Sequence, residues 1–166
     1  MDKNQVIINY MLNCPVIRNN PLFFNAIQAQ DENKEIITIA NDRLMNKRYI
    51  DGSVMKRYSF TIVDFRSISF NPVPIIDETT TTTEADYKAE NVEDMFDVQG
   101  IIDWIEEQRD SGNYPDFGDD CVIDDMVTTS DIPNLNGVDA NVSPALAKYS
   151  ITIQIDYIDN SRKSFK

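Results

Sequence analysis

The segment 149–157 alternates apolar and polar side chains without a break, and this pattern constrains the fold more than any other feature of the chain. The apolar positions are Tyr149, Ile151, Ile153, Ile155 and Tyr157. Successive side chains of a β-strand point to opposite faces, so this period of two predicts a strand in a sheet with one buried and one solvated face. Such a sheet is antiparallel or mixed, and we expect helices to cover its buried face.

Further strands are predicted over residues 22–28, 35–40, 54–70 and, more weakly, 119–128. The polar segment 31–33 predicts that the first two of these strands form a hairpin. Asp51-Gly52 is a pair typical of two-residue type I′ turns, and it predicts a second hairpin that leads into the strand at 54–70. In that strand the apolar parity changes between Ile62 and Val63, which predicts a bulge or bend there.

Two helices are predicted. The first spans residues 2–14, with Asp2 as its cap, Gln5 completing a capping box and Pro15 ending it. Its apolar face consists of Ile7, Tyr10, Met11 and Cys14. The second begins at Asn91 and ends near Arg109, before Gly112. Its apolar stripe consists of Met95, Val98, Ile102 and Ile105, with Phe96, Ile101 and Trp104 beside it.

The segments 71–90 and 130–147 are predicted to be extended loops or arms, because proline, threonine, glycine and acidic residues interrupt any apolar pattern in them. The expected architecture is a single α+β domain over residues 1–166. It has an antiparallel or mixed β-sheet with two helices packed on one face.

Composition excludes several function classes. The chain of 166 residues contains no histidine, which removes Ser-His-Asp and Cys-His nucleophiles and histidine metal ligands. Its net charge of −13 argues against nucleic-acid binding by the chain as a whole. The two cysteines, Cys14 and Cys121, are expected to be free, buried or half-buried thiols in a protein that folds in a reducing cytoplasm. No apolar run has the length of a membrane helix.

Short motifs give no catalytic, cofactor or metal prediction. Asp116-Phe117-Gly118 matches a kinase tripeptide by chance, since the other kinase motifs are absent. Four nearby aspartates fit no EF-hand spacing and are interpreted as a solvated acidic rim. They are Asp119, Asp120, Asp124 and Asp125. We therefore expect no enzyme activity.

One basic cluster lies on both sides of Asp51-Gly52. It consists of Arg43, Lys47, Arg48, Lys56 and Arg57. These residues could simply solubilise the strands, or they could form a docking site for an acidic neighbour, such as another copy of the chain.

Three stretches together resemble the tail terminator or "minor capsid" proteins of long-tailed phages of Gram-positive bacteria. The first is Arg48-Tyr49-Ile50-Asp51-Gly52-Ser53 with the strand Arg57-Tyr58-Ser59-Phe60-Thr61-Ile62. The second is Ile101-Ile102-Asp103-Trp104-Ile105-Glu106-Glu107-Gln108, followed by Asn113-Tyr114-Pro115-Asp116-Phe117-Gly118. The third runs from Ala147 to Tyr157. The motifs are structural and cover roughly residues 45–158, whereas the preceding residues match only in kind.

The resemblance implies a tail-terminator-like α+β fold without enzyme activity or cofactor. It implies a ring of copies, a hexamer by expectation, that caps the tail tube and joins the tail to the head's connector or stopper protein in the virion. The virion would be assembled in the host cytoplasm. DNA would cross the ring's lumen without specific binding, and carboxylates there would repel its phosphates. We expect contacts with sister copies or partners at Arg48, Tyr49, Asp51, Gly52, Lys56, Arg57, Thr81, Asp86, Asn134 and Asn136.

Two alternatives stay open at this point. The chain could be another head–tail component, such as a stopper or a tube protein. It could instead be a monomeric acidic binding module, whose binding to a basic partner would depend strongly on salt.

Overall fold

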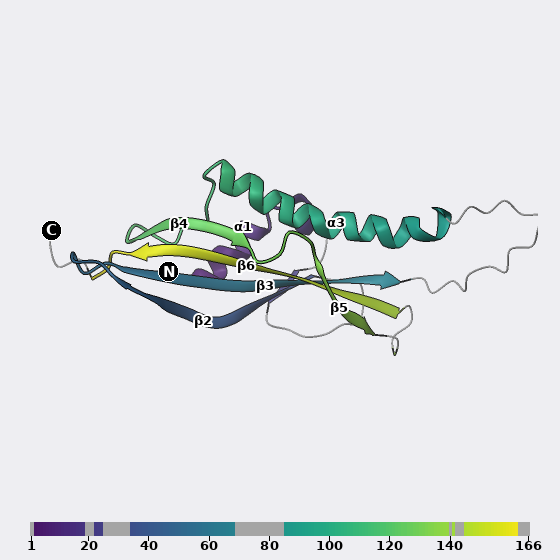
Figure 1. The fold of residues 1–166 in the computed structure, drawn as a ribbon, viewed down its shortest axis with the longest axis horizontal. Helices are drawn as coiled ribbons and strands as arrows, with labels where there is room; N and C mark the ends of the chain where they lie inside the picture. Colours follow the sequence, from purple (N-terminus) through teal and green to yellow (C-terminus); the bar gives the residue numbers. More distant parts are fainter. Residues whose placement is uncertain are drawn as a thin grey trace, which may run out of the picture.

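The computed structural model describes residues 2–18, 22–24, 34–68, 85–139, 141 and 145–162, which form three helices and a six-stranded sheet (Figure 1). The helices are α1 (Lys3–Met11), α2 (Pro15–Arg18) and α3 (Ala85–Asp110). The strands are β1 (Leu22–Phe24), β2 (Lys34–Arg48), β3 (Val54–Ile68), β4 (Cys121–Thr128), β5 (Asn134–Asp139) and β6 (Ala145–Asp159). The fold is therefore of the mixed α+β class that the sequence predicts.

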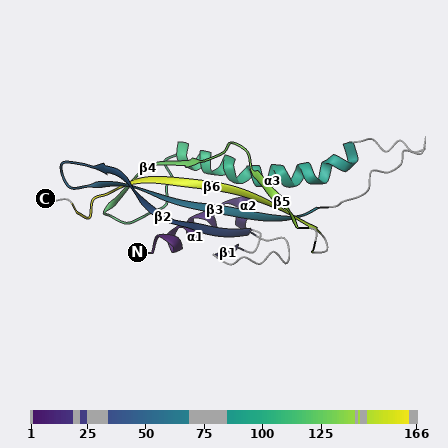
Figure 2. The same cartoon turned by 60° about the horizontal axis from the view of Figure 1, so that its bottom comes forward.

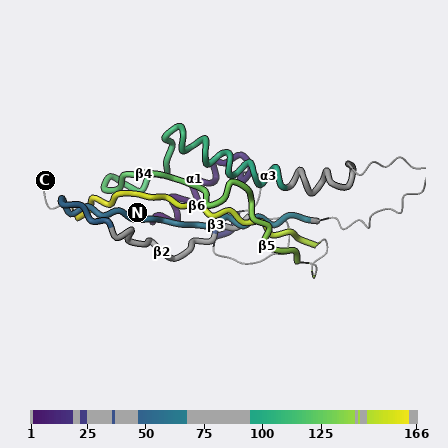
Figure 3. The backbone as a smooth tube through the Cα atoms, viewed as in Figure 1, coloured from purple at the N-terminus to yellow at the C-terminus, as the bar shows by residue number. Residues whose placement is uncertain are grey.

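Strand β6 organises the sheet, whose order is β1-β2-β3-β6-β4. One edge of β6 pairs with β3 along its whole length, from Ala145↔Ile68 to Asp159↔Val54. Its other edge pairs with β4 near the end of β6 and with β5 near its start. The strand with the clearest alternation in the sequence is thus an interior strand, paired with three others (Figure 3).

The predicted bulge at Ile62–Val63 is wrong, because β3 pairs with β6 there without a register shift. The parity changes for another reason. Ile62 belongs to the main core, whereas Val63 and Phe65 join Leu146 in a second buried cluster. Adjacent strand residues point to opposite faces, so the second cluster lies on the other side of the sheet. The irregularities in the β2–β3 pairing lie between Ile39 and Arg48 instead.

The predicted hairpin between residues 22–28 and 35–40 is also wrong. β1 pairs with the start of β2 in parallel, with Leu22 opposite Lys34. Parallel strands cannot be joined by a tight hairpin and need a crossover. The polar segment 31–33 and the rest of the predicted first strand lie outside the described residues.

The main core lies between one face of the sheet and the helices. Its members from α1 and the turn after it are Ile7, Met11 and Cys14, and those from α3 are Val98, Ile101, Ile102 and Ile105. They pack with the alternating residues of β6, from Ile151 to Tyr157, as predicted. Tyr10 and Trp104 join α1 to α3, with ring centroids 5.2 Å apart. Both main helices therefore contribute to the same apolar layer.

The predicted ends of helix α1 are confirmed in part. Asp2 caps the helix, since its Oδ1 accepts a hydrogen bond from Asn4 N at 3.0 Å. The Gln5 side chain donates to Asn9 Oδ1 rather than completing a capping box. Pro15 does not end helical structure but begins α2, a position that suits its fixed φ and missing N–H.

Helix α3 begins earlier than predicted, at Ala85 rather than Asn91. Residues 85–90 are therefore helical and not part of an arm, while residues 71–84 lie outside the described residues. Within the predicted stripe Met95 is exposed, as is its neighbour Phe96, whereas Val98, Ile102 and Ile105 are buried. Past the end of α3, Gly112 has a φ of +68°, as a C-terminal glycine should.

The predicted loop at 130–147 contains β5 and the first residues of β6. β5 has little apolar content and carries a register shift between Leu135 and Gly137, which hides its alternation in the sequence.

Candidate functional site

The turn between β2 and β3 carries most of the residues expected at an interface. Tyr49 N donates to Ser53 O at 2.9 Å, and Gly52 N donates to Tyr49 O at 3.0 Å. These bonds enclose a three-residue loop, Ile50 to Gly52, rather than the predicted two-residue type I′ turn. Gly52 has a φ of +88°, the left-handed conformation that closes such a loop.

Asp51 has a structural task in this turn. Its Oδ1 accepts hydrogen bonds from Ser53 N at 3.0 Å and from Ser53 Oγ at 2.6 Å. These bonds make the turn a rigid support for the two side chains before it, Tyr49 and Ile50, both of which are exposed. We call the exposed residues Lys47, Arg48, Tyr49 and Ile50 the hairpin tip.

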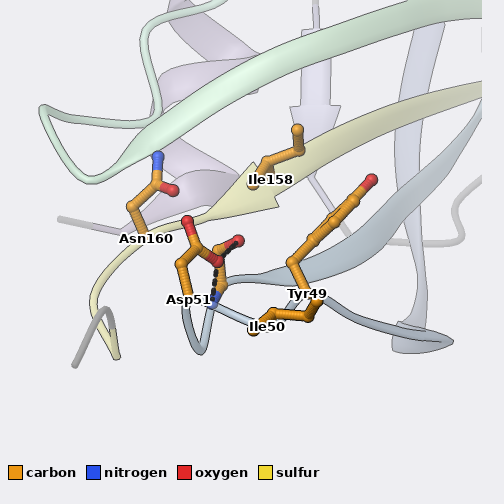
Figure 4. Close-up of a pocket in the computed structure, with 6 residues that line it drawn as sticks. Tyr49, Ile50, Asp51, Ile158 and Asn160 are labelled. Atoms are coloured by element: carbon orange, nitrogen blue, oxygen red, sulfur yellow. Dashed lines mark hydrogen bonds between the residues drawn. The ribbon is translucent and has the colours of Figure 1, made fainter. Parts of the chain in front are cut away.

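An open hollow of about 510 Å³ lies beside the hairpin tip (Figure 4). Its lining residues are Tyr49, Ile50, Asp51, Ser53, Ile158 and Asn160. Tyr49, Ile50 and Ile158 give it apolar walls, and the carboxylate of Asp51 is already hydrogen-bonded to Ser53. This arrangement suits contact with an apolar side chain of another protein better than acid–base chemistry.

Two residues of the predicted basic docking site are neutralised by strand β6. Arg57 forms a bidentate ion pair with Asp156, at 2.6 Å from Nε to Oδ1 and 2.7 Å from Nη2 to Oδ2. Lys56 Nζ lies 2.7 Å from Asp159 Oδ2. Adjacent strand positions point to opposite faces, so these cations do not form one patch. The docking interpretation therefore keeps Lys47 and Arg48, whereas the Arg43 side chain lies outside the description.

These pairs shift the titration of their members. The hydrogen bond with Asp156 raises the pKa of Arg57. Burial alone would raise the pKa of Asp159, but hydrogen bonds from Lys56 and Ser161 outweigh it and hold that pKa well below its ordinary value. Both effects stabilise the charged form, so the pairs are intact at neutral pH.

The other expected interface residues lie elsewhere. Asn134 and Asn136 are exposed on β5, which pairs with the start of β6, at the end of the molecule opposite the hairpin tip (Figure 1). The Asn136 side chain donates to Ser150 Oγ. Asp86 lies in α3, with its side chain outside the description, and Thr81 lies outside the described residues. The predicted residues therefore mark two separate surfaces rather than one site.

Sequence reasoning missed a cluster on the helix side of the sheet. Lys3 Nζ hydrogen-bonds Tyr157 Oη and lies 5.5 Å from the centre of the Phe117 ring. The rings of Phe117 and Tyr157 pack edge to face, 5.3 Å apart. Phe117 is thus a core residue from a loop, where Gly118 N donates to Asp116 Oδ1 at 2.8 Å. The tripeptide at 116–118 builds a turn.

The cysteines and the acidic side chains were the other candidates for chemistry. Cys14 is buried and Cys121 half-buried, and neither forms a disulfide, as predicted; burial raises the pKa of Cys121. Within the described ranges, no three acidic or cysteine side chains gather closely enough to hold a metal ion. None of the helices in that part of the chain combines the length and apolar character of a membrane span.

A scan against models of protein families finds no match for the chain, and a search of curated proteins finds none either. The resemblance to tail terminators therefore rests on the sequence motifs alone.

Proposed function

We propose that the chain is a structural virion protein, a tail terminator whose copies form a ring, expected to be hexameric, at the head-proximal end of a phage tail tube. The observation that carries the proposal is the exposure of apolar side chains at both ends of an elongated body. Ile50 is fully exposed on a rigid turn at one end, and Leu135 on β5 is exposed at the other. Exposed apolar residues at two separate places favour contacts with more than one neighbour.

The residues that carry the resemblance support this proposal by their roles. Gly52 closes the hairpin, Trp104 packs against Tyr10, and Phe117 fills the core. Tyr157 completes the buried face of β6. Each of these residues has a structural role in the fold, as the resemblance implies.

The charge supports the expected passage of DNA. A ring of six copies would carry six times the net charge of −13. Carboxylates at the lumen would repel phosphates and keep DNA from adhering. In this proposal the partners are sister copies, the tube protein on one side, and the connector or stopper on the other.

The exposed apolar residues also weigh against the monomeric acidic module, because binding through charge alone does not require them. A stopper or a tube protein would share the same surfaces, and the phenotype separates them from a terminator. We expect loss of a terminator to leave tubes of uncontrolled length, loss of a stopper to leave tubes of normal length, and loss of a tube protein to leave no tubes.

The test is electron microscopy of particles made without this chain by the phage that encodes it. We expect tails of irregular, excessive length that are not joined to heads, and rescue by the chain supplied in trans. Tails of normal length joined to full heads would overturn the proposal. Supplying a chain with Leu12→Asp, a change at an exposed site just after α1 and away from both ends, is the matched control and should rescue fully.

A further inference from the structure

An exposed apolar surface lies between the first half of α3 and strand β5. Its members are Met95, Phe96, Ile132, Leu135 and Val138, and we call it the α3–β5 surface. Phe96 is 65% exposed and Leu135 is 58% exposed, values that are high for large apolar side chains. Several exposed apolar side chains in one region favour an interaction site in a folded protein.

Pairing and hydrogen bonds bring these residues together. Leu135 lies opposite Tyr149 and Val138 opposite Ala147, so both share the face of β6 that carries the main core. Helix α3 crosses this region, because Gln99 Nε2 donates to Asp131 O at 3.0 Å, next to Ile132. Residues three and four apart lie on the same side of a helix, so Met95 and Phe96 flank Gln99 one turn earlier.

The hairpin tip lies at the other end of the elongated body in both views (Figures 1 and 2). Ile50 is fully exposed there, with Tyr49 beside it and the open hollow behind them. An aromatic and an aliphatic side chain presented on a rigid turn have the character of anchor residues at protein interfaces.

The hairpin tip and the α3–β5 surface carry exposed side chains of opposite charge. Lys47 and Arg48 are exposed at the hairpin tip, and no described side chain forms an ion pair with them. At the α3–β5 surface, the carboxylate of Asp131 is exposed, and so is that of Asp97, whose Oδ2 lies 3.4 Å from Arg66 Nη1. Copies with a net charge of −13 repel one another overall, so a contact between copies needs cations of one facing carboxylates of the other.

We propose that the hairpin tip of one copy docks on the α3–β5 surface of the next copy, in a head-to-tail contact. In this contact Ile50 and Tyr49 pack against Phe96 and Leu135. Arg48 forms ion pairs with the carboxylates of Asp97 and Asp131. Because the two surfaces differ, each copy uses one to bind its predecessor and the other to bind its successor, and repetition gives a ring or a filament. Closure as a ring rests on the proposed function, whereas the contact itself does not.

The experiment measures association of the full chain by sedimentation velocity at rising protein concentration. Ile50→Asp removes the tip anchor and Phe96→Asp disrupts the surface, and each should weaken association about 30-fold or more. Mixed together, the two variants retain one intact tip and one intact surface, so they should form heterodimers that grow no further. Leu12→Asp makes the same change at an exposed site away from both ends and should associate like the wild type.

A charge exchange tests the orientation. Arg48→Glu and Asp131→Lys should each weaken association, and a mixture of the two should recover it in part. The contact is refuted if the wild type stays monomeric at its solubility limit, or if Ile50→Asp and Phe96→Asp behave like Leu12→Asp. It is also refuted if Phe96→Asp leaves association unchanged and alters only the hydrogen exchange of the monomer. That result is expected if residues 69–84 of the same copy, rather than a second copy, cover the surface. Any of these results combined with overlong tails in particles lacking the chain would leave the proposed function standing.

Discussion

Replacing Arg66 with methionine should strongly destabilise the fold, because Arg66 neutralises a carboxylate buried beside α3. Asp64 is 2% exposed, and Arg66 Nε lies 3.1 Å from its Oδ1. Arg66 Nη1 also lies 3.4 Å from Oδ2 of Asp97, which belongs to α3 and is mostly exposed. One guanidinium therefore holds a buried and an exposed carboxylate and ties the helix to β3.

The contacts of Arg66 with Asp64 and with Asp97 should contribute differently to the free energy of unfolding. Removing one partner of a buried ion pair typically destabilises a protein by about 3–5 kcal/mol, whereas an exposed pair contributes about 0–1 kcal/mol. We expect Arg66→Met to lower the free energy of unfolding by about 3 kcal/mol and Asp97→Asn by at most about 0.5 kcal/mol. With a urea m-value of about 2 kcal/mol/M, the first change lowers the unfolding midpoint by about 1.5 M.

The measurement is urea unfolding followed by circular dichroism. The double variant Asp64→Leu with Arg66→Met removes both buried charges and should lie within about 1 kcal/mol of the wild type. Hydrogen exchange around Asp97 should rise in Arg66→Met if the pair fixes α3 on the sheet. A midpoint change of less than about 0.5 M for Arg66→Met, or no recovery in the double variant, would refute the reasoning.

Two further stability predictions follow from the site geometry. Phe117→Ala should lower the free energy of unfolding by about 3–5 kcal/mol, because the Phe117 ring contacts those of Tyr58 and Tyr157 and its removal opens a cavity between them. Thermal unfolding measures this change, and a loss below about 1 kcal/mol would contradict the prediction. Asp159→Asn should lower it by about 1 kcal/mol at pH 7, through loss of the pair with Lys56. Because the folded-state pKa of Asp159 is depressed, that contribution is complete above the ordinary pKa near 3.8 and declines below it. The difference in free energy of unfolding between the wild type and Asp159→Asn should therefore become smaller as the pH falls below about 4. A difference that grows would contradict the assigned ion pair between Lys56 and Asp159.

The parts of the fold that the sequence predicted are those where burial alone sets the pattern. Ile151, Ile153 and Ile155 alternate because β6 is an interior strand covered on one face, so the period of two is complete. Residues 85–90 were missed because they carry helix-forming residues without an apolar stripe, and periodicity alone does not detect such a segment. The parallel pairing of β1 and β2 depends on tertiary contacts that no local pattern encodes.

The candidate site was predicted less well, for a physical reason. Lys56 and Arg57 are adjacent in the sequence and suggest one basic patch, but strand geometry sends them to opposite faces. Their partners, Asp156 and Asp159, become apparent only from the register between β3 and β6. The sequence does not predict Ile50 as an interface residue, because the exposure of an apolar residue in a turn is a property of the folded chain.

The interior position of β6 has a consequence for how the molecule folds. Strands β3, β4 and β5 all precede β6 in the chain and pair with it, and among the described strands β4 and β5 pair with no other. Until residues 145–159 have left the ribosome, the apolar faces of the earlier segments have no sheet to complete, and the contacts that finally close are distant in sequence. We expect the nascent polypeptide to remain a client of chaperones until then. A copy truncated before β6 would be removed by proteolysis rather than enter an assembly.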